Sequence, residues 1–317
     1  MRILTGEQLR TLLPTSALVA AVEQSLRAMT QRQVEVPARH HIPWAGGTLL
    51  LMPAVGAGHI GVKLVSVVPG NAGTPLPVTS GLMVLLDGKT GQPLALLDAA
   101  VLTARRTGAV GALSLKLMTP GLLDSIGIIG TGVQGAWQAI SACAVRPIKD
   151  IYYVARSTRS AEQFVNTVQN HVDDVRLIPC SNSRALLQAT STVITATTSM
   201  NPVIPDDPKL LEGKHFISVG SFKPSMQELP HSVYSAARQL VIDSEAARHE
   251  VGDVINPVND GILAASDVFH LVELVDGTRS VNVNDTTVFK SVGSALYDIF
   301  VADALLREAV NIDASRP

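Results

Sequence analysis

The sequence predicts an α/β protein in which a Rossmann-type, doubly wound parallel sheet is joined to an α+β domain. From residue 124 onward, short β-branched runs alternate with helical patterns, which is typical of parallel strands covered by helices on both faces. Between residues 36 and 97, strand patterns instead follow one another with turns between them, as in an antiparallel sheet. The length of 317 residues is sufficient for about two domains.

The N-terminal region is expected to begin with two helices. Thr5 followed by Gln8 fits a capping box for a short helix, and Pro14 ends that helix. Thr15 or Ser16 then caps a longer amphipathic helix that extends to about residue 29. Strands are predicted at 40–44, 48–55, 60–68, 81–86 and 94–97, with a hairpin turn at 87–91 and a helix at 102–118.

The second region repeats a strand–helix unit. Predicted strands span residues 125–129, 150–155, 175–179, 192–197, 215–220 and 239–243, and predicted helices span 134–145, 160–171 and 183–189. A final amphipathic helix at 293–310 is expected to pack back onto the first domain. We therefore predict one domain at residues 1–120, completed by 290–317, and a second domain at 121–289.

A glycine-rich turn stands between the strand at 125–129 and the helix behind it. Its residues are Gly130, Thr131, Gly132, Val133, Gln134 and Gly135, which match the Gly-x-Gly-x-x-Gly fingerprint of dinucleotide sites. The first glycine permits the tight turn, the second lets the backbone approach a pyrophosphate, and the third lets helix and strand pack closely. The free N–H groups and the positive dipole end of the helix then face the phosphates. Residues 121–289 are therefore predicted to form a dinucleotide-binding domain.

The end of the second strand in this domain favours NADP(H) over NAD(H). NAD sites usually carry an acidic residue about 20 residues after the glycines, where it binds the ribose 2′-hydroxyl. This chain instead has Arg156, Ser157, Thr158 and Arg159 there. Arginine pairs bidentately with a 2′-phosphate, and the hydroxyls add donors. The alternative is that both arginines are ordinary solvated charges at a helix start.

Composition and charge argue against several function classes. The net charge of −2 provides no electrostatic reason to bind nucleic acid or an anionic membrane, and no apolar run approaches the ~18 residues of a membrane span. With 46% hydrophobic residues and no secretory leader, the chain is expected to be globular and cytoplasmic. Cys143 and Cys180 lack metal-ligand spacing and are expected to be buried thiols, and no metal site is predicted.

Basic residues in unusual settings precede the nucleotide domain. Lys63 lies in an apolar strand and shares a face with Val65 and Val67, so it is either an edge-exposed lysine or part of a site. Arg105 and Arg106 lie near the start of a helix and point about 100° apart, so only one of them readily enters a given pocket. A bound anion would offset the unfavourable position of cations at a helix N-terminus.

Arg39 and two histidines lie earlier in the chain. Arg39, taken alone, is interpreted as a surface residue. His40 and His41 point to opposite faces of their strand, which makes them a poor metal pair, and they are interpreted as structural. Two or three cations facing a nicotinamide would suit a substrate carboxylate, with hydride arriving at the neighbouring carbon.

Four of these segments together resemble the ornithine cyclodeaminase/mu-crystallin family. They are Lys63 in its strand, residues 98–112, the glycine turn at 130–135 and residues 289–293, in the family's order over nearly the whole chain. The resemblance implies a homodimer built through the first domain, which would also bind the substrate. The resemblance also implies that Arg39, Lys63 and Arg106 bind a substrate carboxylate. It implies that the cofactor is bound by the glycine turn and residues 155–158, with minor contacts from Thr79, Thr197 and Ser291.

One position departs from the cyclodeaminases of this family. Where those enzymes carry an aspartate that handles the substrate amine, this chain has Phe222, which can neither accept a proton nor pair with an ammonium. The chain therefore looks more like the family's ketimine reductases, which reduce Δ1-pyrroline-2-carboxylate to L-proline or Δ1-piperideine-2-carboxylate to L-pipecolate with NAD(P)H. Lys63 is the predicted catalytic residue, which orients the carboxylate or helps to polarise the imine.

Two other interpretations stay open. The enzymatic alternative is an ornithine or lysine cyclodeaminase, or an amino-acid dehydrogenase that deaminates a small substrate such as alanine. The non-enzymatic alternative is an NADPH-dependent small-molecule binding protein of the mu-crystallin type.

Overall fold

The computed structural model describes residues 1–71 and 74–315, which form two compact units. The first unit comprises Met1–Arg106 and the C-terminal segment from Ser294 onward, and the second comprises Thr107–Gly293. The chain crosses from the first unit to the second within the helix α3 (Ala99–Met118). The limits and roles assigned above to the two domains stay a prediction.

A six-stranded sheet organises the first unit. Its order is β1-β6-β5-β4-β3-β2, formed by β1 (Arg2–Leu4), β6 (Pro93–Asp98), β5 (Thr79–Asp87), β4 (His59–Val67), β3 (Gly47–Gly56) and β2 (His40–Trp44). Neighbouring strands are antiparallel, as predicted, except that β1 pairs with β6 in parallel. The strand β1 is not predicted from the sequence, because it forms only by pairing with β6, which lies about 90 residues later in the chain.

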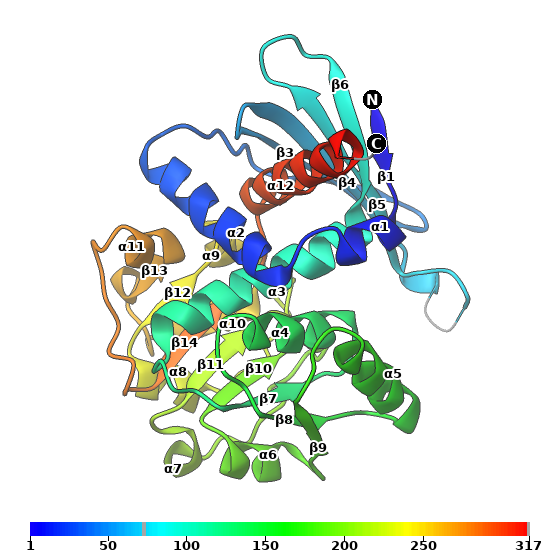
Figure 1. The fold of residues 1–317 in the computed structure, drawn as a ribbon. Helices are drawn as coiled ribbons and strands as arrows, with labels where there is room; N and C mark the ends of the chain where they lie inside the picture. Colours follow the sequence, from blue (N-terminus) through cyan, green and yellow to red (C-terminus); the bar gives the residue numbers. More distant parts are fainter. Residues whose placement is uncertain (72–73, 316–317) are drawn as a thin grey trace. The chain divides into compact units, whose positions relative to one another are not determined.

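Helices cover one face of this sheet. The C-terminal helix α12 (Ala295–Ala314, red in Figure 1) lies across β3 and β4 and packs against α2 (Thr15–Thr30), while α1 (Gly6–Thr11) contacts β6. The predicted capping box of α1 at Thr5 is confirmed. The predicted cap of α2 is wrong, because Pro14 occupies the N-cap position and its fixed φ suits the turn between the two helices. Helix α3 begins earlier than predicted, since Asp98 Oδ1 accepts the N–H of Val101 at 2.9 Å.

An eight-stranded parallel sheet organises the second unit. Its order is β13-β12-β14-β11-β10-β7-β8-β9, formed by β13 (Val268–His270), β12 (Leu240–Ile242), β14 (Thr287–Lys290), β11 (His215–Ser218), β10 (Thr192–Thr195), β7 (Ser125–Ile129), β8 (Asp150–Val154) and β9 (Arg176–Pro179). Strands after β9 are added on the other side of β7, so the order reverses between β7 and β10. Ligands of such sheets bind at this reversal, outside the carboxyl ends of the strands.

Helices pack on both faces of the parallel sheet, which confirms the predicted doubly wound fold (Figure 1). The helices are α4 (Val133–Cys143), α5 (Thr158–Gln169), α6 (Ser183–Ala189), α7 (Pro208–Leu211), α8 (His231–Ala237), α9 (Ala247–Glu250), α10 (Gly252–Asn259) and α11 (Leu271–Val275). A buried apolar cluster under α6 to α10 joins side chains such as Leu186, Phe216 and Val254. The predicted strands agree with the structure to within two residues at each end, whereas β13 and β14 were not predicted.

Cys143 and Cys180 are free thiols, and each is half-buried. The predicted burial of both cysteines is therefore only partial. Burial nevertheless raises the pKa of Cys143 to about 12.

Among the described residues, no helix is long and apolar enough to cross a membrane, and no group of metal-binding side chains is present.

Candidate functional site

The glycine turn has the geometry that its sequence predicts. Gly130 follows β7 with φ +101°, and a Cβ there would lie 2.4 Å from the carbonyl oxygen of Ala196. A Cβ at Gly135 would lie 2.0 Å from the carbonyl oxygen of Gly130. Gly132, in contrast, has no protein atom near its Cβ direction, and it is the N-cap of α4 without a side-chain cap. The first and third glycines are therefore required by the protein's own packing, whereas the space at the second is open to a ligand.

The four residues predicted to select the cofactor, Arg156, Ser157, Thr158 and Arg159, are all exposed at the start of α5. Ser157 is the N-cap of this helix, and its Oγ accepts the N–H of Ser160 at 3.2 Å. The hydroxyl also hydrogen-bonds the Ser160 Oγ, so it is already engaged in capping. The arginines remain available to an anion at this helix start.

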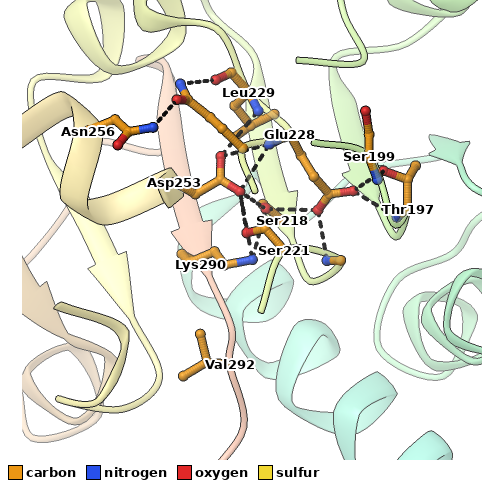
Figure 2. Close-up of polar contacts among 12 residues, drawn as sticks. Thr197, Ser199, Ser218, Ser221, Glu228, Leu229, Asp253, Asn256, Lys290 and Val292 are labelled. Carbon is orange, nitrogen blue, oxygen red and sulfur yellow. Dashed lines mark hydrogen bonds and ion pairs between the residues drawn. The ribbon is translucent and has the colours of Figure 1, made fainter. Parts of the chain in front are cut away.

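Thr197 lies just beyond β10 and is held by the buried carboxylate of Glu228. Glu228 Oε1 accepts the Thr197 backbone N–H at 2.7 Å and the Thr197 hydroxyl at 2.8 Å. Its other oxygen accepts the N–H of Gly220 at 2.7 Å and the Ser218 hydroxyl at 3.0 Å, at the end of β11. Glu228 therefore joins the carboxyl ends of two neighbouring strands (Figure 2).

Asp253 and Lys290 complete this buried network. Asp253 accepts the Tyr234 hydroxyl at 2.7 Å and the N–H groups of Glu228 and Leu229 at 3.1 Å. The Lys290 Nζ lies 3.8 Å from Asp253 Oδ2, and both side chains are fully buried. Burial lowers the pKa of Lys290, and the neighbouring carboxylates oppose that effect. Burial, reinforced by Asp253, raises the pKa of Tyr234 well above its usual value.

Ser291, which follows Lys290, is held by another buried carboxylate. Its hydroxyl donates to Asp243 Oδ2 at 2.6 Å, and Asp243 also accepts the N–H groups of Val292 and Gly293. Thr79 lies in the first unit, exposed at the start of β5. The cofactor contacts proposed for Thr79, Thr197 and Ser291 stay predictions.

The first unit carries a buried cluster of Lys63, Asp298 and Arg106. Lys63 is 2% exposed in β4, and its Nζ lies 2.7 Å from Asp298 Oδ2 on α12. Arg106 donates through Nε to Asp298 Oδ1 at 2.8 Å. Lys63 is therefore not an exposed edge lysine, and its role in a substrate site stays a prediction. Two buried cations share one carboxylate, so the cluster has an excess of positive charge when Lys63 is protonated.

The ionisation of this cluster reflects a competition between burial and charge. Burial lowers the pKa of Lys63 to about 8, with Asp298 opposing the shift and Arg106 and Arg39 reinforcing it. Burial also disfavours the ionised form of Asp298, but Lys63 and Arg106 outweigh it and hold the pKa of that carboxyl below its usual value. Arg39 is half-buried, and its positive charge contributes to the lowered pKa of Lys63.

Arg105 has a structural role, as expected if only one of the adjacent arginines can enter a site. Its guanidinium is buried and donates to the carbonyl oxygens of Leu9 and Leu13, at the end of α1 and beyond it. Burial lowers the pKa of Arg105 to about 10. His40 and His41 are exposed in β2.

Phe222 is 52% exposed in the loop after β11, and its ring lies 5.4 Å from the Nζ of Lys223. The loop is tied down by the Gly220 N–H bond to Glu228. The correspondence of Phe222 with the cyclodeaminase aspartate stays a hypothesis.

The acidic partners of Lys63, Lys290, Thr197 and Ser291 were not predicted from the sequence. Asp298 stands in an apolar stretch of α12, and such an isolated carboxylate is a recognisable signal, because buried charges need partners. Lys290 likewise ends the buried strand Thr287–Lys290. Glu228, Asp243 and Asp253 lie in or beside loops and have no comparable signal.

The parallel sheet with its glycine turn defines the fold of a dinucleotide-binding protein. The chain belongs to the ornithine cyclodeaminase/mu-crystallin family, whose sequence model matches residues 2–312. A Δ1-pyrroline-2-carboxylate reductase of Bacillus cereus is 34% identical over 318 residues, which cover 98% of this chain and 97% of that protein. The resemblance inferred from the sequence is therefore confirmed.

Two solved structures share this architecture. Δ1-pyrroline-2-carboxylate reductase of Thermococcus litoralis, in complex with NADH and L-proline, matches with a TM-score of 0.91 and 28% identity over 99% of this chain and 98% of that chain. An archaeal alanine dehydrogenase, a dimer with bound NAD, matches with a TM-score of 0.88 and 26% identity over 98% and 96%.

Proposed function

We propose that this protein is an NAD(P)H-dependent reductase of cyclic imine carboxylates, which converts Δ1-pyrroline-2-carboxylate to L-proline. The observation that carries the proposal is the full-length likeness to a reductase solved with NADH and L-proline, a cofactor and a product of this reaction. Sequence similarity to the Bacillus cereus reductase supports the same activity. The six-membered Δ1-piperideine-2-carboxylate has the same reacting group and is a second candidate substrate.

The buried cations of the first unit supply the chemistry that a substrate carboxylate needs. Arg106 uses Nε for Asp298 and keeps its terminal nitrogens for an anion, and a guanidinium binds carboxylates bidentately. Arg39 adds positive charge beside Lys63. Asp298 neutralises only one of these positive charges, so the cluster keeps an excess of positive charge that a substrate carboxylate reduces. This charge balance favours a monoanionic substrate over a neutral one.

Reduction requires a hydride at the imine carbon and a proton on the imine nitrogen, which together convert the C=N double bond to a C–N single bond. A reduced nicotinamide supplies the hydride when it is bound. The chain's contribution is to hold the substrate in a reactive position. Lys63, with a pKa of about 8, is protonated at neutral pH and either orients the carboxylate or supplies the proton through a water molecule.

NADPH is the proposed preferred cofactor, on the basis of the exposed Arg156 and Arg159 at the start of α5. The dimeric alanine dehydrogenase relative supports a homodimer for this chain as well. A cytoplasmic location stays a prediction.

The decisive assay follows NADPH absorbance with Δ1-pyrroline-2-carboxylate and, separately, with its six-membered homologue. We expect oxidation of NADPH and formation of L-proline, and NADH should be the poorer cofactor. Absence of NADPH oxidation with either cyclic imine would reject the reductase proposal. A KM for NADH equal to or below that for NADPH would reject the cofactor preference.

A second candidate function is the oxidative deamination of alanine, which the likeness to the archaeal alanine dehydrogenase favours. That activity would appear as alanine-dependent reduction of NAD⁺ with release of ammonia. Release of ammonia from ornithine would instead indicate cyclodeamination. Tight binding of NADPH and a carboxylate without any turnover would indicate a binding protein.

A further inference from the structure

The carboxylate of Glu228 accepts four hydrogen bonds from donors at the carboxyl ends of two strands. Oε1 accepts the backbone N–H and the hydroxyl of Thr197, and Oε2 accepts the Ser218 hydroxyl and the Gly220 N–H (Figure 2). The side chain is fully buried. Both oxygens are therefore used, and each one serves a different strand of the sheet.

These strand ends lie next to the glycine turn, where the strand order reverses. A Cβ at Gly130 would lie 2.4 Å from the Ala196 carbonyl oxygen and 3.0 Å from the Thr197 side chain. Thr197 is thus packed against the turn on one side. On its other side, a Cβ at Gly220 would lie 2.1 Å from the Thr197 carbonyl oxygen and 2.5 Å from Glu228 Oε1. The three segments are in direct contact, and Glu228 determines their spacing.

Glu228 is itself fixed in place by Asp253. The two Asp253 oxygens accept the backbone N–H groups of Glu228 and Leu229, and Oδ2 also accepts the Ser221 hydroxyl at 2.5 Å. Lys290 donates to the Ser218 hydroxyl at 3.1 Å. The side chains of Glu228, Asp253, Ser218, Ser221 and Lys290 are all buried and hydrogen-bonded, so a small movement of Glu228 would break several bonds at once.

We propose that Glu228 is a positioning residue for the nicotinamide half of the cofactor. This inference rests on the proposed function, because it takes the carboxyl ends of β10 and β11 as the place where the reacting end of the dinucleotide lies. The Thr197 hydroxyl donates to Glu228 and accepts the N–H of Ser199 at 3.2 Å. Its single proton is therefore committed, and Thr197 contributes to the cofactor site through its position and not as a hydrogen-bond donor.

The variant Glu228→Gln tests this role with little change in volume. A carboxylate accepts through both oxygens, whereas a glutamine amide accepts through one oxygen and donates through its NH₂ group. The amide oxygen can therefore accept either the two donors of Thr197 or the donors of Ser218 and Gly220. The NH₂ group then faces the two remaining donors, with which it forms no equivalent hydrogen bonds. One strand end is released while the apolar packing is kept. Thr197→Val, which removes one of the four donors, provides a milder form of the same perturbation.

The readouts separate the two halves of the cofactor. Binding is measured for NADPH and for 2′-phospho-ADP-ribose, which has no nicotinamide, and hydride transfer is measured with NADPH and with 4-deuterated NADPH. We expect Glu228→Gln to weaken NADPH binding or slow hydride transfer by about 10–100-fold, as for other small misplacements of reacting groups. Its affinity for 2′-phospho-ADP-ribose should stay within about 2-fold of wild type. The deuterium isotope effect on kcat should rise, because hydride transfer becomes more rate-limiting, and Thr197→Val should show smaller changes in the same direction.

Thr287→Val is the matched control. It removes a buried hydroxyl that hydrogen-bonds the His215 ring at 2.5 Å, at the amino ends of β11 and β14, away from the strand ends in question. It should lower stability without changing the nicotinamide-dependent readouts.

Three outcomes would overturn the inference: wild-type hydride transfer and NADPH affinity in folded Glu228→Gln, an equal loss of affinity for NADPH and 2′-phospho-ADP-ribose, or the same kinetic defect in Thr287→Val. Failure of the proposed function is seen separately in the wild-type protein. If the wild-type protein binds NADPH but reduces no cyclic imine, the substrate assignment fails, and the two binding measurements still decide the role of Glu228. If it binds no nicotinamide dinucleotide at all, both proposals fail.

Discussion

Replacing Lys290 by methionine tests whether the buried charges of the nucleotide-binding unit balance one another. Lys290 is fully buried, and its Nζ lies 3.8 Å from Asp253 Oδ2 and 3.1 Å from Ser218 Oγ. Methionine retains most of the volume and removes the charge. The variant leaves Asp253 and Glu228 buried without the positive charge that Lys290 provides.

The expected loss follows from the distance and the burial. Two unit charges about 4 Å apart attract by about 4 kcal/mol at an effective dielectric constant of about 20. Removing one partner of a buried ion pair costs about 3–5 kcal/mol, because the other charge remains desolvated. We therefore expect Lys290→Met to lower the free energy of unfolding by about 3–5 kcal/mol, a large fraction of the stability of an ordinary domain.

Urea unfolding followed by circular dichroism measures this loss, with Lys214→Met as the matched control. Lys214 is half-buried and donates to the Thr190 carbonyl oxygen at 2.9 Å, so its loss should cost about 1 kcal/mol. A deficit no larger than that of Lys214→Met would refute the charge-balance argument.

Three further predictions concern the reaction. The pKa of Lys63 is lowered to about 8 and its protonated form is required, so kcat/KM for the cyclic imine should fall as the pH rises through about 8. Lys63→Arg should abolish this fall. A fall that persists in the variant would argue against Lys63 as the titrating group. Asp298→Asn removes the charge that opposes the lowering of the Lys63 pKa, so the fall in kcat/KM should move to lower pH, and an unshifted pH profile would contradict this role. The double variant Arg156→Ala/Arg159→Ala should raise the KM for NADPH by about 10-fold, as expected for loss of a charge-assisted hydrogen bond. The KM for NADH should stay nearly unchanged. Equal increases in KM for both cofactors would count against selection of NADP(H) by these arginines.

Local patterns in the sequence were sufficient for most of the fold. Strand and helix periodicity located β2 to β12, and the glycine spacing located the turn after β7, because these signals depend on neighbouring residues. The three-residue strands β1 and β13 and the four-residue β14 escaped detection. These segments are strands because neighbouring strands of a sheet pair with them: β1 with β6, β13 with β12, and β14 with β11 and β12.

The candidate site was predicted only in part, and Arg105 and Arg106 illustrate the limit. Helical geometry alone required the two side chains to point in different directions, which the structure bears out. Which of them joins Lys63 depended on where α1 and α12 pack, because Arg105 meets the carbonyl oxygens at the end of α1 and Arg106 meets Asp298. No local pattern contains that information.

The sequence by itself determined the type of most strands and of the longer helices, the dinucleotide fingerprint and the presence of cations suited to an acid. Only the tertiary structure decided which carboxylate each buried cation faces: Asp298 for Lys63 and Arg106, and Asp253 for Lys290. The physical reason is that the strength of a charge pair depends on distance and on exclusion of water, and folding sets both between residues far apart in the chain.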